Sequence, residues 1–305
     1  MDKIDLSIEI AGLKLKNPVI AASGTFGFGR EFSKYIDLNE LGGISVKGLT
    51  LEARQGNGPP RIAETPSGIL NSVGLQNPGV EEFIKKEIPF LREYDLAIIA
   101  NIAGNTIEEY CKMAEILSEC DVDALELNVS CPNVKHGGVA FGNSARGISE
   151  VTKMVRKCCK KPLIVKLTPN VTDIKEIARA AEEEGADAIS LINTILGMAI
   201  DIHKKRPVLS NNMGGLSGPA IRPIAVRMVY EAARTVNIPV IGMGGICSGD
   251  DAIEFMLAGA SAVMVGTANF MDPAACLNVI RGIKNYMKMH GHSRLDEIIG
   301  KLKLN

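Results

Sequence analysis

The stretch Ala124-Leu-Glu-Leu127-Asn128-Val-Ser-Cys131-Pro-Asn133 decides how the rest of the chain is interpreted. A run made mostly of apolar residues ends at an amide, a thiol and a turn-forming proline. This is the pattern of a buried strand that stops where polar chemistry begins. Cys131 follows the strand end and precedes a glycine-containing loop, a setting in which a thiol is accessible. The stretch therefore predicts a strand end that contributes to a functional site.

The same pattern recurs at seven other short apolar runs, each followed by a residue that can hold a ligand. These runs are residues 19–22, 44–46, 96–100, 163–165, 188–192, 240–241 and 262–265. Eight such strands predict an α/β fold, a (β/α)8 TIM barrel, whose active site is built from the carboxyl ends of the strands. Residues 1–10 alternate polar and apolar side chains, which predicts a short N-terminal β element before the barrel.

Helical periodicity and capping signals fill the gaps between these strands. The predicted helices span residues 80–93, 106–120, 172–184, 222–236 and 248–257. Thr106 and Glu109 have the spacing of a capping box, and Ser248 is suited to cap the last of these helices. Two connections, residues 48–95 and 195–222, are longer than a simple crossover needs. We expect them to be inserted loops at the C-terminal face of the barrel, where long loops commonly carry function.

Length and composition agree with one barrel domain spanning residues 1–305. The chain is 46% hydrophobic and has a formal net charge of -1, so it offers no broad basic field for nucleic acid. The start of the sequence has no long apolar segment of the kind that forms a signal peptide or a membrane anchor. We therefore expect a cytoplasmic protein. Seven cysteines without a Cys-x-x-Cys pair disfavour a disulfide framework, and we expect no metal or iron-sulfur site in this chain.

Two glycine-containing loops follow the last two predicted strands. They read Gly242-Met-Gly244-Gly245-Ile-Cys-Ser248 and Val265-Gly266-Thr267-Ala-Asn269. In barrels these two loops commonly bind a phosphate through backbone N–H groups and a helix N-terminus. The alternative is that the glycines only make tight turns. Neither loop matches the dinucleotide fingerprint, so a mononucleotide phosphate is the better fit.

Lysines and asparagines lie at the ends of other strands. Lys47 and Lys166 each end an apolar run, where a charge is costly unless an anion receives it; a salt bridge at the rim is the alternative for either one alone. Asn101, Asn128 and Asn193 each offer amide donors and an acceptor that match the edge of a flat heterocycle, although each singly could be a turn former. The loop from Asn71 to Gly79 would expose backbone N–H groups to a carboxylate.

Several of these segments resemble the class 1 dihydroorotate dehydrogenases. The resemblance is carried by Pro18-Val-Ile-Ala-Ala-Ser-Gly24, Gly24-Thr-Phe-Gly-Phe-Gly29, Asn71-Ser-Val-Gly-Leu-Gln-Asn-Pro-Gly79, Asn128-Val-Ser-Cys-Pro-Asn133 and Gly242-Met-Gly-Gly-Ile246, and it extends from about residue 4 to residue 290. Within the class, the Phe-Gly-Phe-Gly element and Ala63-Glu-Thr-Pro-Ser-Gly-Ile-Leu-Asn71 are similar to type B, the NAD+-linked catalytic subunit. Cysteine at position 131 separates the chain from class 2, which has serine there.

The resemblance implies an FMN cofactor across the barrel mouth. Its phosphate would contact Gly218, Gly244, Gly245, Gly266 and Thr267, and its ribityl chain and ring would contact Ser23, Lys47, Gly48, Asn101, Asn128, Lys166 and Ile192. The substrate would be held by Lys47, Asn71, Ser72, Val73, Gly74, Leu75, Asn128, Asn193 and Thr194. Gly48 departs from the alanine or small hydroxyl residue expected after the lysine.

The implied reaction oxidises (S)-dihydroorotate to orotate in de novo pyrimidine (UMP) biosynthesis. Cys131 would remove the C5 proton while FMN takes the C6 hydride, and the Lys166 ammonium would stabilise the reduced flavin. His136 is a rival base, although an exposed loop histidine is the simpler interpretation, and residues 134–142 have the composition of a lid. Electrons would pass to NAD+ through a partner subunit with FAD and a [2Fe-2S] cluster, in a heterotetramer of two catalytic and two partner chains.

Other functions stay open on the sequence alone. Among flavin enzymes they are a class 1A-like, fumarate-linked dihydroorotate dehydrogenase and an activity like that of dihydropyrimidine dehydrogenase. A phosphate-binding barrel lyase or isomerase without flavin fits the 242–269 loops but leaves Cys131 and the asparagines without a role. For a non-catalytic scaffold, the polar residues at the strand ends would be turns only.

Overall fold

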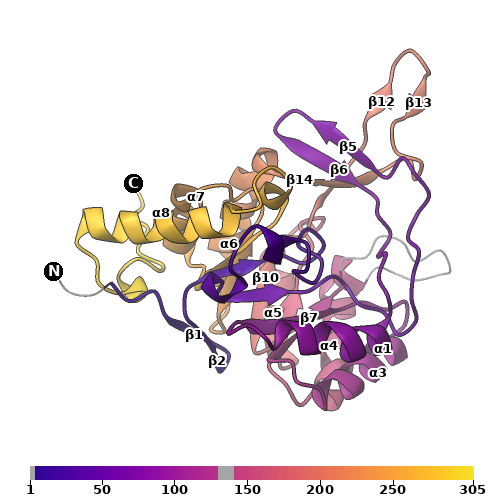
Figure 1. Ribbon diagram of the computed structural model, residues 1–305. Helices are drawn as coiled ribbons and strands as arrows, with labels where there is room; N and C mark the ends of the chain where they lie inside the picture. The colour runs from indigo at the N-terminus through magenta and orange to yellow at the C-terminus, as the bar shows by residue number, and fades with distance from the viewer. Residues whose placement is uncertain (1–3, 130–140) are drawn as a thin grey trace.

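The computed structural model describes residues 4–129 and 141–305 of the chain. Eight parallel strands, paired in chain order, close into a barrel when the last strand pairs with the first (Figure 1). The strands are β3 (Val19–Ala21), β4 (Gly43–Ser45), β7 (Ala97–Ile102), β8 (Ala124–Asn128), β9 (Leu163–Lys166), β10 (Ala188–Leu191), β15 (Val240–Met243) and β16 (Ala262–Val265). The predicted TIM barrel is confirmed.

Helices alternate with these strands and cover the outside of the barrel. The helices are α1 (Val80–Glu82), α2 (Ile88–Leu91), α3 (Ile107–Ser118), α4 (Ala145–Cys158), α5 (Ile174–Glu183), α6 (Arg222–Ala233), α7 (Gly249–Ala258) and α8 (Ala275–His290). A π-helical segment, Phe83–Glu87, joins α1 to α2, and short 3-10 helices span Phe32–Lys34, Leu38–Glu40, Phe141–Asn143, Pro219–Ile221, Thr267–Phe270 and Leu295–Glu297. The outward side chains of the strands and the inward faces of the helices form one large apolar core.

The five helices predicted from sequence are present within a few residues at each end, and three of them begin at a capping side chain, Thr106, Asp173 or Ser248. Ser248 caps α7 in a complete capping box with Asp251. At α3 the predicted box is only half formed. The Thr106 hydroxyl accepts from the Glu109 N–H, but the Glu109 carboxylate accepts from the N–H of Asn105 at 2.6 Å instead of returning to Thr106.

The predicted N-terminal β element is an antiparallel hairpin of β1 (Ile8–Ile10) and β2 (Leu13–Leu15). Its buried side chains, Ile10, Leu13 and Leu15, pack in one cluster with the first residues of four barrel strands, which are all alanines. Those alanines are Ala97, Ala124, Ala188 and Ala262. Small side chains at this level leave room for the larger hairpin residues, so the hairpin closes the N-terminal end of the barrel.

The two long connections meet at the other end of the barrel. They contribute a four-stranded antiparallel sheet of β5 (Ile62–Thr65), β6 (Gly68–Asn71), β14 (Gly214–Ser217) and β11 (Ile195–Gly197), and a hairpin of β12 (Ile200–Asp201) and β13 (Arg206–Pro207). In Figure 1 these strands project away from the barrel on the side opposite β1 and β2. The pairing of Asn71 with Gly215 joins the two insertions beside the mouth of the barrel.

Candidate active site

A cavity of about 460 Å³ opens at the C-terminal end of the barrel, within the usual size range of small-molecule sites. Every predicted site residue that lies in the described part of the chain lines it. These residues are Ser23, Lys47, Gly48, Asn71, Ser72, Val73, Gly74, Leu75, Asn101, Asn128, Lys166, Ile192, Asn193, Thr194, Gly218, Gly244, Gly245, Gly266 and Thr267. Cys131 and His136 lie outside the described residues, as does the predicted lid up to residue 140.

The alternation of a β-strand explains why polar residues from separate strands converge here. Side chains two residues apart share a face, so Asn128 and Glu126 point to the same side of β8 as Ala124, which lies inside the barrel. The parallel register places Asn128 beside Lys166 of β9 and Glu126 beside Asn101 of β7. Apolar side chains fill the lower interior of the barrel, and polar ones form the floor of the cavity.

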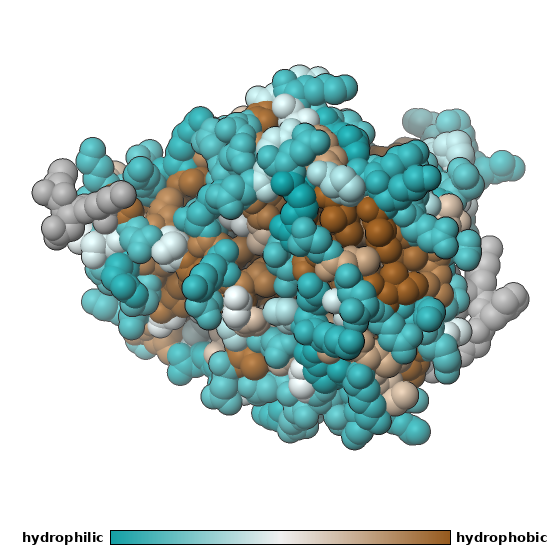
Figure 2. All heavy atoms as spheres, turned by 60° about the horizontal axis from the view of Figure 1, so that its bottom comes forward, coloured by the Kyte–Doolittle hydropathy of each residue, from teal (hydrophilic) through white to brown (hydrophobic). Residues whose placement is uncertain are grey.

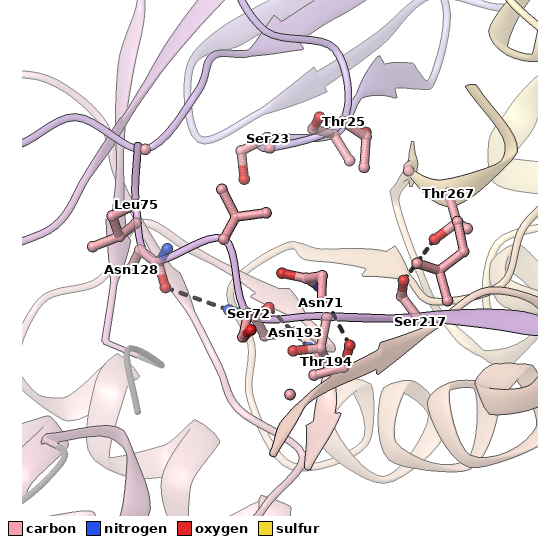
Figure 3. A pocket seen from close by; sticks show the side chains of 18 of the residues that line it. Ser23, Thr25, Asn71, Ser72, Leu75, Asn128, Asn193, Thr194, Ser217 and Thr267 are labelled. Carbon is pink, nitrogen blue, oxygen red and sulfur yellow. Dashed lines mark hydrogen bonds between the residues drawn. The ribbon is translucent and has the colours of Figure 1, made fainter. Parts of the chain in front are cut away.

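The three strand-end asparagines form a chain of amide contacts. Asn128 Nδ2 donates to Asn101 Oδ1 at 3.4 Å, and Asn193 Nδ2 donates to Asn128 Oδ1 at 3.4 Å. The far end is fixed, because Asn193 Oδ1 accepts from the Thr194 N–H at 2.8 Å. Figure 3 shows Asn128, Asn193 and Thr194 on one side of the pocket, with Ser23 and Thr25 facing them. The amides are thus oriented as a set.

The two lysines differ in their surroundings. Lys166 is 4% exposed and donates from Nζ to the Ser23 hydroxyl at 3.1 Å. For Lys47, burial lowers the pKa of the ammonium, and the positive charge of Arg61 lowers it further. Both effects oppose the charged form, so an anion placed beside Lys47 would be favoured. The buried surroundings of Lys47 therefore differ from those of a rim lysine in a salt bridge, the alternative considered from the sequence.

Glu126 is a site residue that the sequence did not reveal. Its side chain is fully buried, and its carboxylate accepts from Ser45 Oγ and Ser190 Oγ at 2.7 Å each. It also accepts from Asn101 Nδ2 at 2.5 Å, and the Lys166 ammonium lies 3.8 Å away. The only signal available beforehand was a glutamate inside an otherwise apolar run, at a position that alternation assigns to the barrel interior.

The loop after β6 presents Ser72 to the cavity. Its hydroxyl is buried and has no hydrogen-bond partner among the described residues. Nearby, Asn71 Nδ2 donates to the carbonyl of Gly215 at 3.3 Å, and Asn57 Nδ2 donates to the carbonyl of Ser72 at 2.8 Å, so the backbone is held in place. A buried hydroxyl without a partner inside a cavity is the arrangement expected where a ligand supplies the missing hydrogen bond.

Gly48 has a steric explanation in the structure. A Cβ atom at this position would lie 3.0 Å from Asn101 Oδ1 and 3.1 Å from Leu75 Cδ2, both closer than ordinary contact. Glycine at position 48, in place of the expected alanine or small hydroxyl residue, therefore lets the backbone lie close to the Asn101 amide.

The glycine loops after β15 and β16 line the opposite end of the cavity. Gly244 and Gly245 have φ angles of +129° and +82°, and a Cβ at Gly245 would lie 2.7 Å from the carbonyl oxygen of Gly218. Tight backbone geometry alone thus requires these glycines, and the phosphate role stays a prediction. Thr267 Oγ1 donates to Ser217 Oγ at 2.9 Å (Figure 3). Ser217, like Thr25, lines the cavity and was not predicted.

The residues present fit both ligands that the resemblance implies. One end of the cavity has glycines and hydroxyls suited to a phosphate, and the other has two ammonium groups, three amides and an unpaired hydroxyl suited to a flat, anionic heterocycle. In residues 4–129 and 141–305, no group of three or more His, Cys, Asp or Glu side chains could hold a metal ion. Over the same residues, no helix combines the length and apolarity needed to span a bilayer.

Comparisons with known proteins agree with this site. The family model described as dihydroorotate dehydrogenase matches residues 5–287. The chain is 62% identical over 302 residues to a protein of Alkaliphilus metalliredigens, and 62% identical over 302 residues to one of Thermoanaerobacter pseudethanolicus. Each alignment covers 99% of this chain and 100% of the relative. A protein of Bacteroides thetaiotaomicron is 60% identical over 301 residues, covering 98% of this chain and 99% of its own length.

All three relatives are named dihydroorotate dehydrogenase B (NAD(+)), catalytic subunit. The family model covers most of the chain, and identity near 60% extends over almost its whole length. This chain belongs to the dihydroorotate dehydrogenase family, within its NAD+-linked B group of catalytic subunits.

Proposed function

We propose that the cavity at the barrel mouth is where this chain oxidises (S)-dihydroorotate to orotate, a step of de novo pyrimidine biosynthesis. The observation that carries the proposal is the convergence of Lys47, the three asparagines and the unpaired Ser72 hydroxyl in one cavity. Dihydroorotate has amide edges and carries a carboxylate, and its oxidised product orotate is flat. The amides match its ring, and the ammonium and the hydroxyl match its carboxylate.

FMN would lie along the same cavity, with its phosphate at the end lined by the glycine loops. Gly218, Gly244, Gly245, Gly266 and Thr267 would contact its phosphate, and Ser23, Lys47, Gly48, Asn101, Asn128, Lys166 and Ile192 would contact the ribityl chain and the ring. When bound, FMN supplies an acceptor for the substrate hydride. The Lys166 ammonium, which donates to Ser23, would stabilise the negative charge of the reduced flavin ring.

Cys131 is the base in this proposal. It lies three residues after Asn128, whose side chain is at the cavity, and a thiolate there would accept the C5 proton of the substrate. Asn71 to Leu75 and Thr194 would orient the substrate by hydrogen bonds. In this proposal the proton acceptor and the hydride acceptor contact the same molecule.

We further propose that the electrons reach NAD+ through a partner subunit that carries FAD and a [2Fe-2S] cluster. The names of the relatives support a partner, because each is called a catalytic subunit. Exposed apolar side chains on the mouth insertions offer it a surface, among them Leu196, Ile200 and Ile202. Hydrophobic residues also gather on the face shown in Figure 2. We expect two catalytic and two partner chains per complex, acting in the cytoplasm.

An absorbance spectrum of the purified chain before and after anaerobic dihydroorotate tests the proposal. We expect a flavin spectrum that bleaches on addition, and orotate as the product. A colourless protein, or a flavin that dihydroorotate leaves oxidised, would exclude this function.

The same bleached enzyme separates the alternatives. Fumarate that reoxidises it at the rate of full turnover would favour the class 1A-like enzyme, and bleaching by dihydrouracil would favour the dihydropyrimidine-dehydrogenase-like one. Fast NAD+ reduction by the isolated chain would contradict the partner subunit.

A further inference from the structure

Glu126 is buried in the barrel with its two carboxylate oxygens in different surroundings. Oε1 accepts from Ser190 Oγ, whereas Oε2 accepts from Ser45 Oγ and Asn101 Nδ2 and faces the Lys166 ammonium. Enclosing a carboxylate is costly unless hydrogen bonds and a counter-charge compensate it. Two serine hydroxyls, one amide and the Lys166 ammonium supply that compensation, and all but the Ser190 hydroxyl face Oε2.

The Oε2 atom determines which way Asn101 points. A carboxylate oxygen accepts hydrogen bonds, so Asn101 must turn its NH2 group toward Glu126 and its carbonyl toward Asn128. Asn128 must then offer its own NH2 group to Asn101 and its carbonyl to Asn193. The Thr194 N–H fixes the other end at Asn193 Oδ1, so the series of amides is held at both ends, by Glu126 and by Thr194.

We infer that Glu126 is a positioning residue that sets the donor and acceptor pattern of the substrate site through this series of amides. The inference rests on the proposed function, in which Asn128 and Asn193 bind the substrate. Without an acceptor at Oε2, only the 3.4 Å contact from Asn128 opposes a half-turn of the Asn101 amide, and Asn128 loses the fixed acceptor for its NH2 group although Thr194 still holds Asn193.

Two near-isosteric variants separate this role from its alternatives. Glu126→Met removes the acceptor. Glu126→Gln removes the charge but can place its carbonyl at the Oε2 position, because the Ser190 hydroxyl accepts as readily as it donates and can take the Gln NH2 group. The measurement is the dissociation constant of orotate for the FMN-loaded enzyme, followed by the flavin absorbance change, with thermal unfolding of each variant in parallel.

We expect Glu126→Met to weaken orotate binding about tenfold or more, the loss of one oriented polar contact. Glu126→Gln should stay within about threefold of the wild type, as should Ser190→Ala, which touches only Oε1. Equal losses in the Met and Gln variants would assign the effect to charge beside Lys166 and overturn the inference. So would unchanged orotate binding in Glu126→Met, which would leave Glu126 a packing role.

A double-mutant cycle with Asn128→Ala tests the series directly. With Asn128 truncated, the orientation of Asn101 is no longer passed on, so Glu126→Met should cost at least about fivefold less than in the wild type. Independent, additive losses would contradict the inference. If Glu126→Met fails to fold or to bind FMN, Asn101→Ala interrupts the same series with the carboxylate left in place, and additive behaviour with Asn128→Ala would again overturn it.

Different measurements would refute the substrate site and the role of Glu126. A wild-type protein that does not bind orotate would refute the proposed substrate site itself. A wild type that binds orotate, together with an Asn128→Ala variant that binds it weakly, supports that site whatever the Glu126 variants do. The dissociation constant of FMN, measured by fluorescence quenching on the flavin-free protein, shows whether any variant acts through loss of the cofactor.

Discussion

The hydroxyl of Tyr110 on α3 donates a 2.8 Å hydrogen bond to the backbone carbonyl of Asn128, at the last residue of strand β8. Both residues are buried. The contact ties the outer helical layer to the point where the chain leaves the barrel toward Cys131, so packing outside the barrel helps to place the site inside it.

Tyr110→Phe should destabilise the protein by about 1–3 kcal/mol, because the buried carbonyl of Asn128 loses a donor while the ring contact with Phe141 is kept. Urea unfolding measures the change. Tyr94→Phe, on a partly exposed tyrosine that packs against Phe90, is the control and should have little effect. Equal stability of the two variants would show that the bond to Asn128 is not needed.

Orotate binding should weaken at alkaline pH, at a lower pH than an ordinary lysine would give. Burial and the charge of Arg61 lower the pKa of Lys47, so its ammonium, and the attraction for the substrate carboxylate, is lost as pH rises through that lowered value. Titrating the orotate dissociation constant against pH locates the alkaline limb.

The Arg61→Gln variant tests whether the pKa of Lys47 controls the alkaline limb of orotate binding. Removing the neighbouring positive charge should raise the pKa of Lys47 and move the alkaline limb to higher pH. A limb that stays in place, or that moves to lower pH, would mean that another group controls binding.

Lys166→Ala should slow flavin reduction by about a hundredfold or more while keeping measurable orotate binding, as expected on removing a charge that stabilises the developing negative charge. Single-turnover bleaching under anaerobic conditions measures the rate. Lys175→Ala, on an exposed lysine of α5 paired with Asp173, is the matched control. Reduction at the wild-type rate in Lys166→Ala would refute the assignment.

The rate of flavin reduction should rise with pH up to about the thiol pKa of Cys131, near 8.5 for an ordinary cysteine, because only the thiolate can accept the proton. Stopped-flow bleaching from about pH 6 to about pH 9 records the profile. A flat profile would remove Cys131 from the role of base.

Thiol alkylation provides an independent check on Cys131. Burial raises the pKa of Cys276 to about 12, and burial together with Cys158 raises that of Cys111 to about 12, so neither should react readily near neutral pH. We expect Cys131→Ser to remove the thiol that orotate protects from iodoacetamide. Protection that persists in this variant would point to another cysteine.

The sequence sufficed for the barrel because its signals are local. Apolar runs mark the strands, and the caps at Thr106 and Ser248 mark where helices begin. The pairing of the two insertions could not be foreseen in the same way, since Asn71 and Gly215 are joined by contacts between segments far apart in the sequence. The choice of Asn105 as partner for Glu109 likewise depends on the local path of the backbone.

The sequence predicted which residues line the cavity better than it predicted the contacts among them. Polar residues at strand ends must converge in a parallel barrel, so Asn128 and Lys166 could be placed together from their positions alone. Glu126 was missed because a single charged residue in an apolar run does not show which partners compensate it. Only the structure reveals that Ser45 and Ser190, from two other strands, enclose it.

The hairpin of β1 and β2 determines from which end of the barrel a ligand reaches the cavity. With Ile10, Leu13 and Leu15 packed across the N-terminal end of the barrel, the described residues leave the polar floor of the cavity open toward the C-terminal end. In the proposed reaction, orotate must leave through that opening before another dihydroorotate can enter, whereas electrons, which need no open path, would pass to the partner subunit while orotate is still bound.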